Sequence, residues 1–153
     1  MEATGWRLFV HPLFEGQLDR LISRVEVMAA REPKDFLAHP AAKLLITIRR
    51  YILETIPRDP AAPEFRLGNA LGPDNKHWFR AKFHQRYRLF YRFSSQQKII
   101  IYTWVNDEFS LRKAGAKTDP YTIFKAMLKR GELPDTFEDL LRQSRRLRPS
   151  GRE

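Results

Sequence analysis

Residues 78–105 read WFRAKFHQRYRLFYRFSSQQKIIIYTWV, and across this stretch the pattern of the chain becomes one of alternation. It predicts three strands, at 78–83, 86–93 and 98–105, because aromatic and β-branched residues dominate each run. The connections at 84–85 and 94–97 are short enough for hairpins. The three strands should therefore form an antiparallel meander.

Side chains alternate across a strand, so odd and even positions sort the meander into two faces. One face is apolar and is predicted to be core: Phe79, Ala81, Phe83, Tyr87, Leu89, Tyr91, Phe93, Ile99, Ile101 and Val105. The other face carries cations and aromatic rings but no carboxylate: Trp78, Arg80, Lys82, Arg86, Arg88, Arg92, Tyr102 and Trp104. Phosphates and bases of single-stranded RNA fit such a surface. We expect an open RNA-binding face; the alternative is a sheet face covered by the last helix.

The remaining chain completes an α+β fold. A strand is expected at 6–10, and helical spacing predicts one helix after Pro12 and a second from Pro40 to Pro57. Asp119 and Pro120 begin a third helix that ends at Gly131. A capping box of Asp135 and Glu138 begins a fourth. These elements predict one domain over residues 1–144, with two helices packed on an antiparallel twisted sheet, and a basic, flexible tail over 145–153.

The composition narrows the class of protein. The 153 residues include 28 Lys and Arg, 18 acidic residues and no Cys, for a net charge of +10. Such a charge favours a polyanionic partner. The missing cysteines favour a reducing compartment, and no apolar run is long enough for a membrane span. We expect a cytoplasmic protein without a membrane partner.

Cleaving RNA without a metal needs a proton acceptor for the 2′-hydroxyl, a proton donor for the leaving oxygen and positive charge at the phosphate. The four histidines show no ligand spacing, so no metal or cofactor is predicted. Lys82 lies between Arg80 and Arg88 on one face, where neighbouring cations favour a neutral lysine. Each of these residues is equally consistent with a simple phosphate anchor. Further RNA contacts are expected from Lys76, before the sheet, and Lys117, in the loop after it.

The motif Arg80-Ala-Lys82, followed by RYRLFYR at 86–92, resembles the strand signature of the RelE superfamily of toxins. The chain is more specifically similar to the YhaV toxins of PrlF–YhaV toxin–antitoxin systems. Further matching features are Gly5-Trp6, His11-Pro12, the run from Trp104 to Arg112, Lys117-Thr118-Asp119, Tyr121 and Met127–Gly131. This resemblance implies a RelE-like fold and endonuclease activity on messenger RNA, and it favours ribosome dependence. It also implies an AbrB-like antitoxin, through which alone the toxin would meet operator DNA.

Matching positions carry the family's site residues onto this chain. Arg80 and Lys82 take the places of paired lysines, and Arg88 that of the arginine in the Tyr-Arg-Leu strand. Arg112 and Tyr121 match a later arginine and tyrosine. The chain departs from the pattern in having arginine at position 80. We expect cleavage to leave a 2′,3′-cyclic phosphate. Two alternatives remain open: a ParE-like toxin that binds gyrase, and an RNA-binding module without catalysis.

Overall fold

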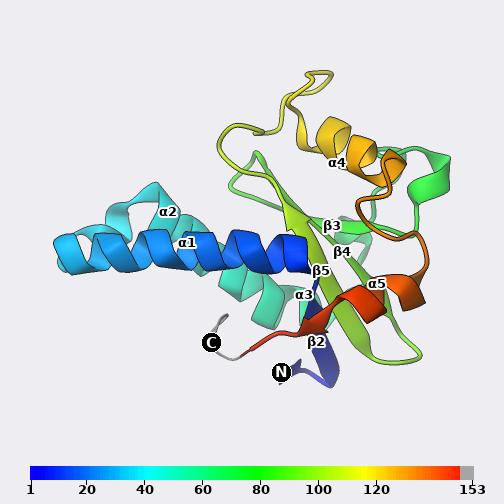
Figure 1. Ribbon diagram of the computed structural model, residues 1–153, viewed down its shortest axis with the longest axis horizontal. Helices are drawn as coiled ribbons and strands as arrows, with labels where there is room; N and C mark the ends of the chain where they lie inside the picture. Colours follow the sequence, from blue (N-terminus) through cyan, green and yellow to red (C-terminus); the bar gives the residue numbers. More distant parts are fainter. Residues whose placement is uncertain (149–153) are drawn as a thin grey trace.

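The structure, a computed structural model, describes residues 1–148 as an α+β fold (Figure 1). Its strands are β1 Glu2–Ala3, β2 Trp6–Val10, β3 Phe79–Phe83, β4 Tyr87–Ser94, β5 Ile99–Val105 and β6 Arg145–Arg146. They form one sheet in the order β1-β2-β5-β4-β3, with β6 paired to β2. The helices are α1 Pro12–Arg31, α2 Pro40–Arg50, α3 Ile56–Arg58, α4 Pro120–Lys129 and α5 Phe137–Gln143. A π-helical segment, Tyr51–Thr55, joins α2 to α3, so this helix continues one residue past Pro57.

The sheet is mixed, which corrects the prediction of an antiparallel sheet. The meander of β3, β4 and β5 is antiparallel as predicted. The first long strand, β2, pairs with β5 in the parallel direction. A parallel neighbour requires a long crossover connection, and the segment containing α1, α2 and α3 supplies part of it. Strand periodicity predicts where β2 lies, but its partner and direction depend on how this connection packs.

A β-bulge divides β5 and changes the predicted faces. Phe90 pairs with Trp104 and Tyr91 with Tyr102, which leaves Thr103 as an extra residue. Trp104 and Val105, which follow the bulge, point to the predicted faces. Before the bulge, the alternation of side chains is shifted by one residue from the predicted pattern. Ile99, Ile101 and Tyr102 therefore lie on the faces opposite to those predicted. The hydroxyl of Thr103 donates to the carbonyl of Phe90 at 2.7 Å.

Both faces of the sheet are covered. On one face α1 and α2 pack against the strands and form the first core. The hairpin of these two helices projects beyond the sheet (Figure 1). On the other face α4 and α5 enclose a second core that contains Trp78, Phe90, Phe124, Met127 and Leu140. The ring centroids of Phe90 and Phe124 are 4.1 Å apart in a stacked arrangement. The prediction of an open basic face is wrong, because Trp78 and Trp104 belong to the apolar surface on which α4 and α5 pack.

The sequence predicts the start of α4 correctly but misplaces the cap of α5 by one residue. Asp119 begins α4 as predicted and accepts from the N–H of Tyr121, and Gly131 follows α4 with φ of +72°. The cap of α5 is Thr136 rather than the predicted Asp135; its hydroxyl accepts from the N–H of Asp139. A threonine one residue closer to the helix replaces the predicted capping box.

The predicted tail also needs correction. Arg145 and Arg146 form β6, and the N–H of Leu147 donates to the carbonyl of Leu8 at 2.8 Å. Leu147 is buried, and Arg145 pairs with Glu15. Arg145 and Arg146 thus belong to the sheet, and Leu147 adds an apolar side chain to the core under α1 and α2. The rest of the predicted tail, 149–153, lies outside the described residues.

His11 links the start of α1 to α5. Its Nδ1 accepts from the N–H of Leu13 at 3.2 Å, and its Nε2 bonds to Oε1 of Gln143 at 2.8 Å. Since Nδ1 is an acceptor, the folded ring is neutral and Nε2 carries the proton. Burial lowers the pKa of His11, with a smaller opposing effect from Gln143. The protein therefore holds His11 in its uncharged form.

We expect the free energy of unfolding to decrease as pH falls below about 6.5, because the unfolded chain then binds a proton that folded His11 excludes. His11→Asn keeps a capping side chain and should reduce this pH dependence. Urea denaturation of both proteins between about pH 5 and pH 7.5 measures the difference. An equal slope for the variant and the parent would contradict the assignment. His77 contributes to the same pH dependence, since burial also lowers its pKa, so the variant should reduce the slope without abolishing it.

No helix within residues 1–148 is both long and apolar enough to span a membrane.

Candidate active site

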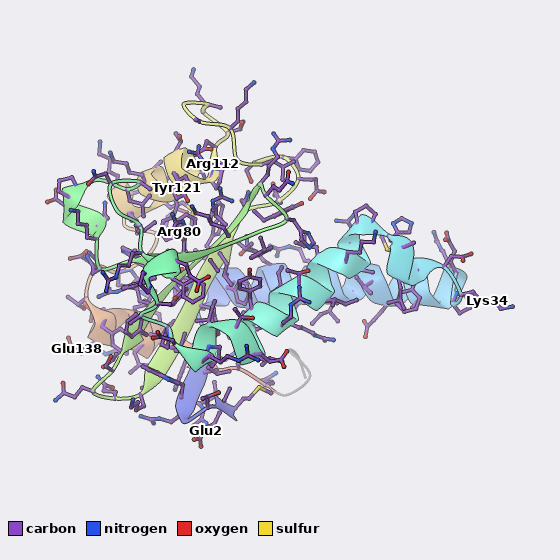
Figure 2. The ribbon with its side chains drawn as sticks, turned by 180° about the vertical axis from the view of Figure 1, so that it is seen from behind. Glu2, Lys34, Arg80, Arg112, Tyr121 and Glu138 are labelled. Atoms are coloured by element: carbon purple, nitrogen blue, oxygen red, sulfur yellow. The ribbon has the colours of Figure 1, made fainter. Side chains whose placement is uncertain are left out.

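Three of the predicted catalytic residues meet at one oxygen atom. The hydroxyl of Tyr121 accepts from Nε of Arg80 at 2.8 Å and from Nε of Arg88 at 3.0 Å. The arginines lie on adjacent strands β3 and β4, and Tyr121 lies in the first turn of α4. Figure 2 shows Arg80, Tyr121 and Arg112 close together beside α4. Strand alternation placed Arg80 and Arg88 on one face and resemblance added Tyr121, whereas the structure joins all three by hydrogen bonds.

Both arginines are buried without a carboxylate partner. Arg80 is 8% exposed and Arg88 7%, and no ion pair within residues 1–148 includes either. Nη1 of Arg80 donates to the carbonyl of Arg66 at 2.6 Å. Burying a charge without an opposite charge is costly, and carbonyl groups compensate it only in part. The pair therefore forms a position where an anion would be stabilised.

The hairpin between β3 and β4 shapes the other side of this position. His84 and Gln85 have φ of +46° and +62°, the two positive values that a tight two-residue turn requires. In this conformation the carbonyl of Gln85 accepts from Nη1 of Arg88 at 3.0 Å. The imidazole of His84 bonds to the hydroxyl of Thr47 on α2 at 2.8 Å. The strained turn thus orients Arg88, and the bond from His84 to Thr47 holds the turn against α2.

The two bonds to Tyr121 also orient its proton. A phenol oxygen has two lone pairs and one O–H, and both lone pairs here face guanidinium groups. The O–H must then point away from the arginines. The O–H is therefore free to donate a hydrogen bond to a further group.

Asp119 holds Arg112 beside the same tyrosine. Its Oδ1 accepts from Nη1 of Arg112 at 2.6 Å and from the N–H of Lys113 at 2.7 Å. Its Oδ2 accepts from the N–H of Tyr121 at 3.1 Å. The guanidinium carbon of Arg112 lies 4.9 Å from the centre of the Tyr121 ring. Asp119, expected only as a helix cap, also positions the later arginine.

Asn106 is a residue that the sequence analysis missed. It is buried, and its Oδ1 accepts from the N–H of Arg88 at 2.7 Å. Its Nδ2 donates to the carbonyls of Arg86 at 3.0 Å and Ser110 at 2.7 Å. Asn106 therefore fastens the loop after β5 to the strand that carries Arg88. The signal in the sequence was an amide side chain directly after a buried strand, at the start of a polar loop.

Lys82, the predicted proton acceptor, remains exposed at the edge of this site. It pairs across the sheet with Arg88, so the two side chains share a face. Among the predicted RNA contacts, three are exposed and available to a ligand: Lys76, Arg86 and Lys117.

Two of the other predicted RNA contacts are buried and cannot stack on bases. Trp78 and Tyr102 have no exposed surface, and the hydroxyl of Tyr102 donates to the carbonyl of Ile52 in the first core. Trp104 is half-buried against α4. The guanidinium of Arg92 lies over the Trp78 ring, and burial lowers its pKa. α4 and α5 cover Trp78, and the bulge turns Tyr102 to the other face, so neither can stack on a base. Trp104 and Arg92 keep exposed surface, and their contact with RNA stays a prediction.

Within residues 1–148, no three His, Asp or Glu side chains are grouped as a metal site would require.

Comparisons with known proteins agree on one family. The model of the YhaV toxin family, described as a toxin with endonuclease activity of a toxin–antitoxin system, matches residues 8–145. The ribonuclease toxin YhaV of Escherichia coli strain K12 is 44% identical over 143 residues, which cover 92% of this chain and 93% of the relative. Toxin YhaV of Escherichia coli O157:H7 has the same identity and coverage. No solved structure matches the chain, so the RelE-like arrangement stays a prediction.

Proposed function

The chain belongs to the YhaV family of toxins with endonuclease activity from toxin–antitoxin systems, and from this premise we propose that it cuts messenger RNA and so arrests translation and growth. One observation supports a phosphodiester substrate: two buried guanidinium groups meet at one hydroxyl without a carboxylate. A phosphate supplies the missing negative charge and the bidentate geometry that arginine prefers. It would sit next to the only proton that the Tyr121 side chain can donate.

The proposed reaction is transfer of the phosphate within the RNA strand. The ribose 2′-oxygen attacks the adjacent phosphorus, and the bond from phosphorus to the 5′-oxygen of the next nucleotide breaks. The products are a 2′,3′-cyclic phosphate and a free 5′-hydroxyl. The 2′-proton leaves to a base, and the 5′-oxygen takes up a proton, so atoms and charge balance.

The side chains divide these tasks. Arg80 and Arg88 bind the phosphate and stabilise the charge that develops on its oxygens. Tyr121 protonates the departing 5′-oxygen, because its lone pairs are already occupied. Lys82 accepts the 2′-proton from the exposed edge of the site, and Arg112, held by Asp119, adds positive charge. Since each task has a side chain, we propose that cleavage requires no metal ion.

Membership in a toxin–antitoxin family implies an antitoxin partner. We propose a PrlF-like antitoxin of the AbrB class, which alone contacts operator DNA. The net charge of +10 favours an acidic antitoxin segment against this basic chain. We place the pair in the cytoplasm, where messenger RNA and ribosomes are found.

The test is to incubate the purified chain with end-labelled messenger RNA, with and without ribosomes and with and without a chelator. We expect fragments that end in 2′,3′-cyclic phosphate and begin with a 5′-hydroxyl, and unchanged rates when the chelator is present. Tyr121→Phe serves as the inactive control. Intact RNA in every mixture would contradict the proposal. Cleavage of ribosome-free RNA that stops with the chelator would contradict its metal-free form.

A further inference from the structure

A groove runs along the exposed side of α4 and begins at the candidate active site. It has a volume of about 570 Å³, and its lining includes Tyr121, Arg112, Lys125 and Lys129. The loop at Ala70 forms the opposite wall. Tyr121 and Arg112 therefore connect the buried arginine pair to an open channel on the surface.

Helical geometry places the two lysines in line with the site. Tyr121, Lys125 and Lys129 are spaced four residues apart, so they follow one face of α4. Each step advances about 6 Å along the helix. This step is comparable with the separation of successive phosphates in an extended single strand. The ammonium groups can thus meet consecutive phosphates of a strand that leaves Tyr121.

The charges in the groove favour a polyanion. Its lining contains one carboxylate, Asp119, which already pairs with Arg112. No ion pair within residues 1–148 includes Lys125 or Lys129, and both are exposed. Lysines that serve only to keep a surface soluble usually alternate with acidic residues. The groove has no acidic residue besides the one that is already paired. Its positive charge is therefore available to a ligand.

Neighbouring residues limit where a strand in the groove can run. A second hollow shares Lys125 and Lys129 with the groove and is also lined by Asp74 and Asp135, whose carboxylates repel phosphates. Lys125 lies over the backbone at Gly72, where its ammonium is 3.8 Å from the position that a Cβ would take. A strand in the groove is thus confined between the loop at 70–72 and α4.

We propose that single-stranded RNA leaves the candidate active site along this groove, with Lys125 and Lys129 bound to the phosphates beside the one that is cleaved. The inference rests on the proposed function, and it moves the RNA from the sheet face, where the sequence placed it, to α4. Bases on such a path face solvent or the loop wall, so binding depends on the backbone rather than on base identity.

The test uses the double variant Lys125→Ala and Lys129→Ala, which keeps helix-forming residues in α4. Its matched control is Lys34→Ala and Lys43→Ala, two exposed lysines at the far end of the α1–α2 hairpin (Figure 2 labels Lys34). Binding is measured to a 2′-O-methyl oligonucleotide, which cannot form the cyclic phosphate, over a range of salt concentrations. The loss of two phosphate contacts should reduce the slope of log K against log salt by about 1.4. The control should keep the parental slope.

Two outcomes separate this inference from the proposed function. A reduced slope for the double variant, with the parental slope kept by the control, supports the groove, and this binding measurement does not require that any preparation cuts RNA. An equal slope for the double variant and the control overturns the groove, and leaves the function intact if Tyr121→Phe still abolishes cleavage.

Discussion

Tyr121→Phe is expected to reduce the maximal rate of RNA cleavage by roughly 10²–10⁴-fold, which is the usual contribution of a positioned proton donor or acceptor. The variant removes one oxygen and leaves the ring that Arg112 contacts. The guanidinium groups remain, so RNA should bind with nearly the parental affinity. Single-turnover cleavage at saturating RNA measures the rate, and the uncleavable oligonucleotide measures the binding.

This variant also changes stability, because Nε of Arg80 and of Arg88 both lose an acceptor. Each buried donor without a partner costs about 1–3 kcal/mol, so urea denaturation should show a loss of about 2–6 kcal/mol for the two. The matched control is Tyr87→Phe, a half-buried tyrosine on the other face of β4. Parental rates from a well-folded Tyr121→Phe protein would exclude Tyr121 as the proton donor.

Arg80→Ala should lower cleavage by about 10²–10³-fold, as expected when one preorganised donor to a developing charge is lost. Cells that express it should continue to grow. The change also removes the bonds from Arg80 to the carbonyls of Glu64 and Arg66, so the loop before β3 loses an anchor. Growth arrest in culture and cleavage by the purified variant provide two independent measurements.

Arg80→Lys separates charge from geometry. Lysine keeps the positive charge, but one ammonium cannot occupy the planar fork that reaches both Tyr121 and the carbonyl of Arg66. We expect this variant to fold and to remain strongly impaired. Arg50→Ala, an exposed arginine at the end of α2, should keep full toxicity. If Arg80→Lys cuts RNA at the parental rate, charge alone suffices and the proposed bidentate contact is wrong.

The alternating stretch at 78–105 determined most of the local structure. It predicted the three strands of the meander to within one residue at each end, because strand preference and tight turns depend on neighbouring residues. Asp119 and Pro120 likewise marked the start of α4. The net charge and the basic motif pointed to a polyanionic substrate before any contact was known.

The layering of the molecule came only from the tertiary structure. Trp78 and Phe90 alternate with cations in the sequence, and nothing in that pattern tells a stacking surface for bases from a packing surface for α4. The bulge at Thr103 is one unpaired residue, and sorting odd and even positions along the strand cannot detect it. Burial of aromatic area decided that this face is a packing surface. Covering the Trp78 ring removes a large apolar area from water, and this gain outweighs the cost of covering the polar groups beside it.

The strands, the helices and the excess of positive charge could thus be inferred from the residues alone, and resemblance added the identities of Arg80, Arg88 and Tyr121. The fold was needed to see that the two arginines and Tyr121 share one oxygen, that α4 and α5 cover the sheet, and that an open groove runs from Tyr121 along α4. Backbone preferences act over a few residues, whereas Tyr121 reaches Arg80 across 41 positions of the chain, through the packing of two apolar layers.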